Sequence, residues 1–340
     1  MNRYNNLFFI LMLTLSLLLL SSCQSDENTL IIYTSVDRNY SEQVFNDFEE
    51  KTGIKVLPAY DTEASKTTGM VNKLIEEQNN PVANVFWNGE FAQTILLKEK
   101  GILAPYKSPE ATVIPQNYKD DEGYWTAFGG RARCILVNTD LVPPNEYPDS
   151  FADILNDEYE PSKIGLAYPI FGTTATHAAA IFAEMGALEA TNFYERVEER
   201  GVRIVDGNGV VRDLVADGTL IFGLTDTDDA LGAVNKGKPV KIIWPDQGED
   251  QQGTLIVPNT VAIIKGSENN KNAQAFVDYI LSEETSDYLF EIGWIQGSTR
   301  APDGEVTILG EEIKTIDVSL EEVYENIEKT KEVLGKVFIR

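Results

Sequence analysis

The chain has 340 residues, with 28 basic and 54 acidic side chains and a net charge of −26 at pH 7. So acidic a surface repels nucleic acid and anionic lipid headgroups, and we therefore exclude nucleic acid as a partner. The length predicts two domains of about 150 residues each, and an apolar share of 43 % suffices for a core in both.

The N-terminal segment has the pattern of a bacterial lipoprotein signal. Arg3 is the only charge in residues 1–22, and an apolar run follows from Leu7 to Leu20. A membrane-spanning helix would need about 20 apolar residues, so the pattern favours an export signal. The run ends in Leu20-Ser21-Ser22-Cys23, which matches the lipobox, where a peptidase cleaves before the cysteine. We expect removal of residues 1–22, lipid attachment at Cys23, a tether over 23–28, and a place in the cell envelope, periplasmic or on the outer face of the membrane.

The second of the two cysteines, Cys134, lies in an apolar stretch over residues 133–137. A lone cysteine in such a stretch is typical of a buried, unreactive side chain. Because Cys23 carries the lipid, no disulfide is expected within the mature chain.

Strands and helices alternate along the chain. Residues 30–34 form a short apolar, β-branched run that predicts a buried strand, and apolar residues then recur at helical spacing from Tyr40 to Phe48. Gly53 ends that helix and 54–56 resume a strand, so the beginning predicts a parallel sheet. Further helices are expected at 68–78, 91–100, 176–185, 190–200, 211–216, 271–292 and 318–335, with strands at 82–87, 165–167, 202–205 and 220–223.

Two long extended runs, 124–137 and 255–264, are expected to cross between the domains. They divide the chain into a first part of lobe 1 over 29–130, lobe 2 over 131–254, and a return to lobe 1 with closing helices over 255–340. The first lobe is therefore expected to be discontinuous in sequence.

Several segments resemble the ferric-iron-type, family 1 extracellular solute-binding lipoproteins of ABC importers. They are residues 32–35 and 48–56 around the first helix, 85–88, 131–133, 253–260, and the late helix 272–282. The resemblance spans essentially the whole mature chain. It implies an α/β, type II periplasmic-binding-protein fold with two lobes, each a mostly parallel sheet flanked by helices, which close on a ligand by hinge motion. It also implies a monomer that docks on an ABC permease and acts with the ATPase through that permease.

One position departs from the family pattern. Iron-binding members commonly supply two adjacent tyrosines after a strand such as 220–223, whereas this chain has Thr225-Asp226-Thr227-Asp228-Asp229 there. Carboxylates are also hard oxygen ligands for a cation. We interpret 225–229 as an acidic loop that binds a cation or an amine, with a solvated acidic turn as the alternative.

Three other loops follow predicted strands and are expected to meet the acidic loop at one cleft, where doubly wound sheets bind ligands. The first is Tyr33-Thr34-Ser35, the second is 171–176 with Thr173 and Thr174, and the third is 206–209 with Asn208. Hydroxyls, an amide and free backbone N–H groups at helix starts attract anions, although simple capping or turn formation is the alternative for each. In iron-type relatives the loop matching 171–176 holds a synergistic anion.

From the first lobe, Glu63, Asn88 and Glu90 are expected to close the site. Arg131 and Arg133 lie two residues apart on an extended segment and so share a face. They can neutralise an anion or pair with the acidic loop. His177, the only histidine, is expected to pack or to support the site from behind, because a lone histidine cannot build a histidine-rich zinc site.

Catalytic signatures are lacking in the sequence, which has no Gly-x-Ser-x-Gly elbow. Residues 232–238 imitate a phosphate loop but run into Pro239, where a Ser or Thr must hold magnesium. We expect a capture protein and not an enzyme; a carboxylate-dependent hydrolase and a sensor or adhesion lipoprotein are the other classes considered.

Two ligands fit these residues. The resemblance favours Fe³⁺ with phosphate or carbonate, the metal ligands being Glu90, Asp226 and Asp228 together with Tyr33. The alternative is a small organophosphate or phosphonate, whose acid group binds Thr173, Thr174 and Asn208 while its amine or hydroxyl faces the acidic loop. The set of ligand-contacting residues is completed by Thr34, Ser35, Glu63, Asn88, Arg131, Thr225 and Thr227.

Overall fold

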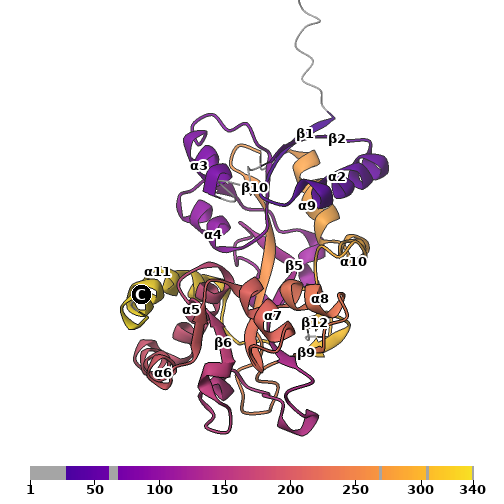
Figure 1. Ribbon diagram of the computed structural model, residues 1–340. Helices are drawn as coiled ribbons and strands as arrows, with labels where there is room; N and C mark the ends of the chain where they lie inside the picture. The colour runs from indigo at the N-terminus through magenta and orange to yellow at the C-terminus, as the bar shows by residue number, and fades with distance from the viewer. Residues whose placement is uncertain (1–27, 61–67, 268–269, 304–305, 339–340) are drawn as a thin grey trace, which may run out of the picture.

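The computed structural model describes residues 28–60, 68–267, 270–303 and 306–338. Two α/β lobes lie end to end, and β5 (Thr126–Asn138) and β10 (Ile256–Ile264) run between them (Figure 1). The predicted fold class is confirmed. Within the described part of the chain, none of the helices combines the length and the apolar character that crossing a membrane requires.

The first lobe is built on a sheet with the order β5-β10-β3-β1-β2. The parallel strands β1 and β3 are mostly buried, which explains their apolar sequence, whereas β2 lies at the edge of the sheet and exposes Leu57. Val44, Phe45 and Phe48 are buried along one face of α2, which ends at Gly53 with φ 71°, a conformation that favours glycine. The elements are β1 (Thr29–Thr34), α2 (Arg38–Thr52), β2 (Lys55–Tyr60), α3 (Thr68–Glu76), β3 (Val85–Asn88), α4 (Ala92–Glu99), β4 (Leu103–Ala104), α9 (Lys271–Leu281) and α10 (Glu283–Glu291).

The second lobe has the strand order β7-β6-β8-β5-β9. β6, β7 and β8 are parallel, and β5 runs antiparallel to β8. The elements are β6 (Ile164–Ala167), α5 (Gly172–Met185), α6 (Ala187–Arg200), β7 (Arg203–Val205), α7 (Asn208–Ala216), β8 (Phe222–Asp226), α8 (Thr227–Val234) and β9 (Val240–Ile243), with 3₁₀ turns in the chain at Pro109–Val113, Gln116–Tyr118, Pro144–Glu146, Phe151–Leu155 and Pro161–Lys163.

Strand β5 changes partners where it passes from one lobe to the other. Ala132 is paired with Ile256 of β10, and the next residue, Arg133, is paired with Asp226 of β8. Close to this point β10 packs tightly on Gly130, where a Cβ atom would lie 2.5 Å from the carbonyl oxygen of Val257. The crossing therefore brings an arginine of β5 to the edge of the second sheet.

The C-terminal part of the chain belongs to both lobes. Strands β11 (Gly297–Ser298), β12 (Val306–Ile308) and β13 (Glu311–Ile313) extend the first sheet beyond β5. Helix α11 (Leu320–Val337) then buries Leu320 and Val323 in the core of the first lobe, and Leu334 in the core of the second. This differs from the assignment of 255–340 to the first lobe, because an 18-residue helix is long enough to reach both cores.

The acidic segment 225–229 is not a loop, which corrects the sequence interpretation. Thr225 and Asp226 end β8, and Thr227 already begins α8. Asp228 and Asp229 occupy the first turn of that helix, where the helix dipole stabilises negative charge. A cluster of carboxylates can therefore form the first turn of a helix. Several acidic residues close together in a sequence do not by themselves indicate a loop.

Candidate ligand site in the cleft between the lobes

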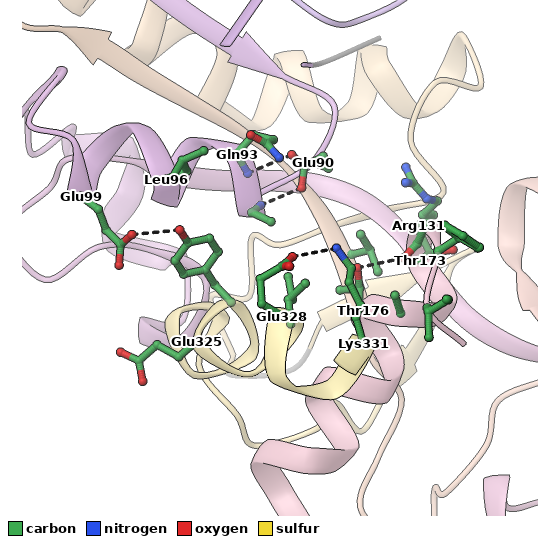
Figure 2. Close-up of a pocket in the computed structure, with 18 residues that line it drawn as sticks. Glu90, Gln93, Leu96, Glu99, Arg131, Thr173, Thr176, Glu325, Glu328 and Lys331 are labelled. Carbon is green, nitrogen blue, oxygen red and sulfur yellow. Dashed lines mark hydrogen bonds and ion pairs between the residues drawn. The ribbon is translucent and has the colours of Figure 1, made fainter. Parts of the chain in front are cut away.

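Two adjoining cavities, of about 600 and 940 Å³, lie between the lobes. They share Glu90, Arg131, Gly172 and Thr173. The smaller cavity reaches toward Ser35 and Trp294, and the larger toward α4 and α11. Figure 2 shows the larger cavity, with Glu90, Arg131 and Thr173 above and beside the α11 residues. The shared residues mark the centre of the cleft.

Helix starts of the second lobe converge on this centre. Thr173 lies in the first turn of α5, Asn208 begins α7, and Asp226 ends β8 directly before α8. Each follows a parallel strand, so the carboxyl ends of β6, β7 and β8 deliver the three side chains to one edge of the sheet. N-termini of helices carry partial positive charge and attract anions.

The three side chains are joined in a buried hydrogen-bond network around Arg133. Its Nη1 donates to Asp226 Oδ1 (2.6 Å), Asn208 Oδ1 (3.1 Å) and Thr173 Oγ1 (3.3 Å). Asn208 Nδ2 donates to Thr173 Oγ1 (2.8 Å) and to Asp226 Oδ2 (3.0 Å), and Thr173 donates a short hydrogen bond to the same carboxylate oxygen. Thr174 adds a bond from its hydroxyl to Asn208 Oδ1 (3.1 Å). Both oxygens of Asp226 are thus engaged by the protein.

The first-lobe wall is formed by the end of β3 and the start of α4. Ser35 Oγ donates to Asn88 Oδ1 (2.5 Å) and accepts the N–H of Gly89 (3.0 Å). The carboxylate of Glu90 accepts the N–H groups of Ala92 (2.7 Å) and Gln93 (3.0 Å). Loss of solvent raises the pKa of Glu90, although these backbone donors act in the opposite direction. Glu90 therefore presents an anchored carboxyl group to the cavity.

Arg131 lines both cavities. Its guanidinium forms no hydrogen bond or ion pair with another described residue, in contrast to Arg133 two residues later. Its charge nevertheless lowers the pKa of the Glu90 carboxyl, which burial raises. The two arginines therefore differ in what they do. Arg133 pairs with Asp226 of the acidic segment, whereas Arg131 faces the cavity.

Asp226, Asp228 and Asp229 are a candidate cation site, because one carboxylate oxygen from each lies within 4.8 Å of the others. Asp228 is exposed, whereas Asp229 is partly buried and pairs with Arg212 at 2.8 Å. Burial, followed by the charge of Asp228, raises the pKa of Asp229 to about 6. Since Asp226 is engaged by Arg133 and Asp229 by Arg212, Asp228 is the carboxylate of this group with the most freedom to bind.

Several predicted ligand residues lie away from the cavity. The hydroxyl of Tyr33 donates to Glu77 at 3.0 Å and Lys73 lies over its ring, on the side of α3. Thr34 is buried and accepts the N–H of Val36. Thr225 and Thr227 are fully buried, Thr225 donating to the Asn208 carbonyl and Thr227 accepting the N–H of Ala132. Glu63 and Cys23 lie outside the described residues.

His177 and Cys134 are buried and line neither cavity. His177 is buried against Phe151, with ring centroids 4.8 Å apart, and burial, followed by the charge of Arg133, lowers its pKa well below the usual value. It therefore packs as a neutral ring. Cys134 is a free, fully buried cysteine whose thiol pKa is raised by burial, which confirms the burial prediction.

Sequence reasoning missed the residues that α11 and the segment before β11 bring to the cleft. Trp294 and Gln296 line the smaller cavity, and Tyr324 and Lys331 line the larger one. Tyr324 donates to Glu99 of α4 at 2.9 Å (Figure 2). These residues follow no predicted strand of either lobe, and α11 reads as an ordinary amphipathic helix, so no local pattern marks them.

A family model described as bacterial extracellular solute-binding protein matches residues 80–294. A Salmonella typhimurium protein named "putative 2-aminoethylphosphonate-binding periplasmic protein" is 23 % identical over 291 residues, covering 82 % of each chain. The major ferric iron-binding protein of Neisseria meningitidis serogroup A is 23 % identical over 265 residues, covering 75 % of this chain and 76 % of that protein.

The fold is also that of solved structures. The open conformation of ferric iron-binding protein A from Mannheimia haemolytica superposes with a TM-score of 0.78 at 19 % identity, over 91 % of this chain and 98 % of that one. At this identity the likeness establishes a shared two-lobed fold.

Proposed function

Because this chain belongs to the family of bacterial extracellular solute-binding proteins, which serve ABC importers, we propose that its cleft captures a small compound carrying both an oxyanion and a cationic group. Aminoalkyl phosphonates are the simplest such class. The oxyanion binds between Arg131 and the start of α5 at Thr173, and the cationic group faces Glu90 and Asp228.

Arg131 is the observation that carries this proposal. A guanidinium is the best side chain for recognising phosphate or phosphonate oxygens, because its N–H groups form a planar fork. Among the described residues it has no hydrogen-bond or ion-pair partner, and it shares a cavity with Thr173 at a helix N-terminus. A cationic side chain left uncommitted beside a positive helix end favours a bound anion.

The carboxylates support the second half of the ligand. Glu90 and Asp228 line the same cavity as Arg131. The amine of a ligand can pair with these two carboxylates, whereas a simple phosphate ion would leave them without a cation. A zwitterionic ligand satisfies both signs of charge at once. The similarity to a protein named for 2-aminoethylphosphonate binding agrees with this class of ligand.

Ferric iron with phosphate or carbonate is the second candidate, favoured by the three clustered carboxylates and by the iron-binding relatives. Fe³⁺ requires several hard anionic ligands. Of the proposed set, Tyr33 bonds to Glu77, and Asp226 has both oxygens engaged. Glu90 and Asp228 remain, so iron would need further ligands from its synergistic anion.

Calorimetry on the mature chain carrying Cys23→Ser distinguishes the candidates, with 2-aminoethylphosphonate, inorganic phosphate, and ferric citrate plus phosphate as probes. We expect one 2-aminoethylphosphonate per chain, bound more tightly than phosphate. Arg131→Gln should weaken it by at least about tenfold, equal to about 1.4 kcal/mol. The matched control is Arg196→Gln on the exposed face of α6, which lines neither cavity.

An outcome in which the phosphonate produces no heat, while one iron binds per chain and is lost with Asp228→Asn, would replace the first candidate by the second. If none of the probes binds, both ligand assignments are wrong.

We also propose that the protein is anchored in the cell envelope and works with an ABC permease. Lipid at Cys23 anchors the protein, the closed form docks on a permease, and no chemical step follows binding. Incorporation of labelled palmitate into the full chain, abolished by Cys23→Ser, tests the anchor; unchanged incorporation in that variant would contradict it.

A further inference from the structure

We propose that Arg133 is a positioning residue that makes the oxyanion site possible by cancelling the charge of Asp226, without touching the ligand. This rests on the proposed function only in assuming that an oxyanion binds at the start of α5. Arg133 is buried beneath the site, where the ligand does not reach it.

Arg133 lies below the cavity floor and not in its lining. Its side chain is 0 % exposed, and it does not belong to the residues that line either cavity. Between it and the cavity lie Thr173, Asn208 and Asp226, each of which accepts a hydrogen bond from its Nη1. Any effect of Arg133 on a ligand therefore passes through these three side chains.

Asp226 is the side chain whose charge matters most. Its carboxylate is 6 % exposed, lines the smaller cavity, and accepts a hydrogen bond from Thr173, the residue offered to the oxyanion. A lone carboxylate at this position would repel an anion strongly, because charges interact over short distances with little screening in a poorly solvated site. The 2.6 Å ion pair with Arg133 makes the floor neutral.

The positive charge under the floor has no other acidic partner in the hydrogen-bond network. Nε and Nη2 of Arg133 are buried and lack hydrogen-bond partners among the described residues. The neighbouring His177 is neutral, since burial and Arg133 lower its pKa. Arg133 and Asp226 therefore balance each other one to one, and removal of either leaves a single buried charge beside the anion site.

This balance predicts opposite effects from two substitutions that break the same ion pair. Arg133→Gln leaves Asp226 negative and should weaken binding of inorganic phosphate and 2-aminoethylphosphonate by about tenfold or more. Asp226→Asn leaves Arg133 positive and should maintain or strengthen phosphate binding. The double variant, neutral like the original pair, should return to within about threefold of the unmodified protein.

A merely structural role for the pair gives a different pattern, since both single variants would then lose affinity and the double variant would lose at least as much. That result would overturn the inference. Melting temperatures measured alongside identify variants that do not fold. If a single variant fails to fold, the phosphate affinity of the double variant alone tests the inference. The double variant is expected to fold, because an uncharged pair often replaces a buried ion pair with little loss of stability.

The failure of the inference is distinguishable from the failure of the proposed function. If the mature Cys23→Ser chain binds neither phosphate nor 2-aminoethylphosphonate, the oxyanion site itself is absent. If it binds them and Arg131→Gln abolishes binding, but the double variant is not restored, only the role of Arg133 is wrong.

Discussion

Arg133 and Asp226 form a 2.6 Å ion pair between β5 and β8, with side chains 0 % and 6 % exposed. The pair lies at the point where β5 enters the second lobe, one residue after its last pairing with β10. A buried pair of this kind contributes little net stability, because desolvation offsets the attraction. In our proposal, its value to the protein is the neutral cavity floor that it provides beside Thr173 and Asn208.

The orientation of Tyr33 gives the first prediction. Its hydroxyl is bonded to Glu77, and Tyr33 lines neither cavity. Tyr33→Phe should therefore change the affinity for any cleft ligand by less than about twofold, since the lost hydrogen bond contributes only about 1 kcal/mol to folding. Calorimetry with 2-aminoethylphosphonate and ferric citrate measures it. A large loss of iron binding in Tyr33→Phe would show that Tyr33 is a ligand after all and would contradict this prediction.

The raised pKa of Asp229, about 6, predicts a pH dependence of stability. The folded protein holds this proton more tightly than the unfolded chain, in which the carboxyl has its usual pKa near 4. The free energy of unfolding should therefore fall as the pH rises from about 4 to about 6, with no further change from this group above that range. Asp229→Asn should flatten this part of a melting-temperature profile; an unchanged slope would assign the dependence to other carboxyls.

The close approach of β10 to Gly130 predicts that Gly130→Ala destabilises the crossing. The new Cβ would meet Val257 O at 2.5 Å and Pro258 Cα at 2.7 Å, both backbone atoms that cannot rotate away. We expect a loss of about 1–3 kcal/mol in urea unfolding. The control is Gly335→Ala inside α11, where nothing lies within 4 Å, and which should stabilise by about 0.5–1 kcal/mol. Equal effects of the two substitutions would contradict the geometry.

The aromatic core of the first lobe predicts a large effect of Phe276→Ala. Phe276 is 0 % exposed and packs on Phe48 with ring centroids 5.2 Å apart. Its truncation should lower the free energy of unfolding by about 3–5 kcal/mol. The matched control is Phe290→Ala, because Phe290 is 47 % exposed on α10. This substitution should lower the free energy of unfolding far less. A small effect at Phe276 would mean that α9 is held to the sheet mainly by other contacts.

Local periodicity was enough to predict most of the first lobe. The helical spacing of Val44, Phe45 and Phe48 and the glycine at 53 predicted α2, and the structure confirms both. The two long extended runs correspond to β5 and β10, which pass between the lobes. These features depend on residues close in sequence, where the period of burial identifies the element.

Long-range arrangement limited the prediction of the site. Thr173, Asn208 and Asp226 do come together, because each follows a parallel strand. The partner of Asp226 could not be predicted, since Arg133 is 93 residues away and only the register of β5 on β8 decides the pairing. Tyr33 was placed in the site because it ends a strand, but the side of the sheet to which a residue points depends on how both faces are covered. The start of α8 at Thr227 was not predicted, because the acidic residues of its first turn were interpreted as a loop.

Helix α11 is a third link between the lobes, beside the two strands. Its beginning is fixed to the first lobe by Val323, by the Tyr324–Glu99 hydrogen bond and by Lys98 3.7 Å from Glu321, while its end lies in the core of the second lobe. Two strands alone would let the lobes swing apart in several directions. With this helix attached to both lobes, separation on the α4 side requires breaking the buried contacts of Val323 and Leu334. A hinge motion of the lobes is therefore expected to widen the cleft mainly on the opposite side, at Ser35 and Trp294.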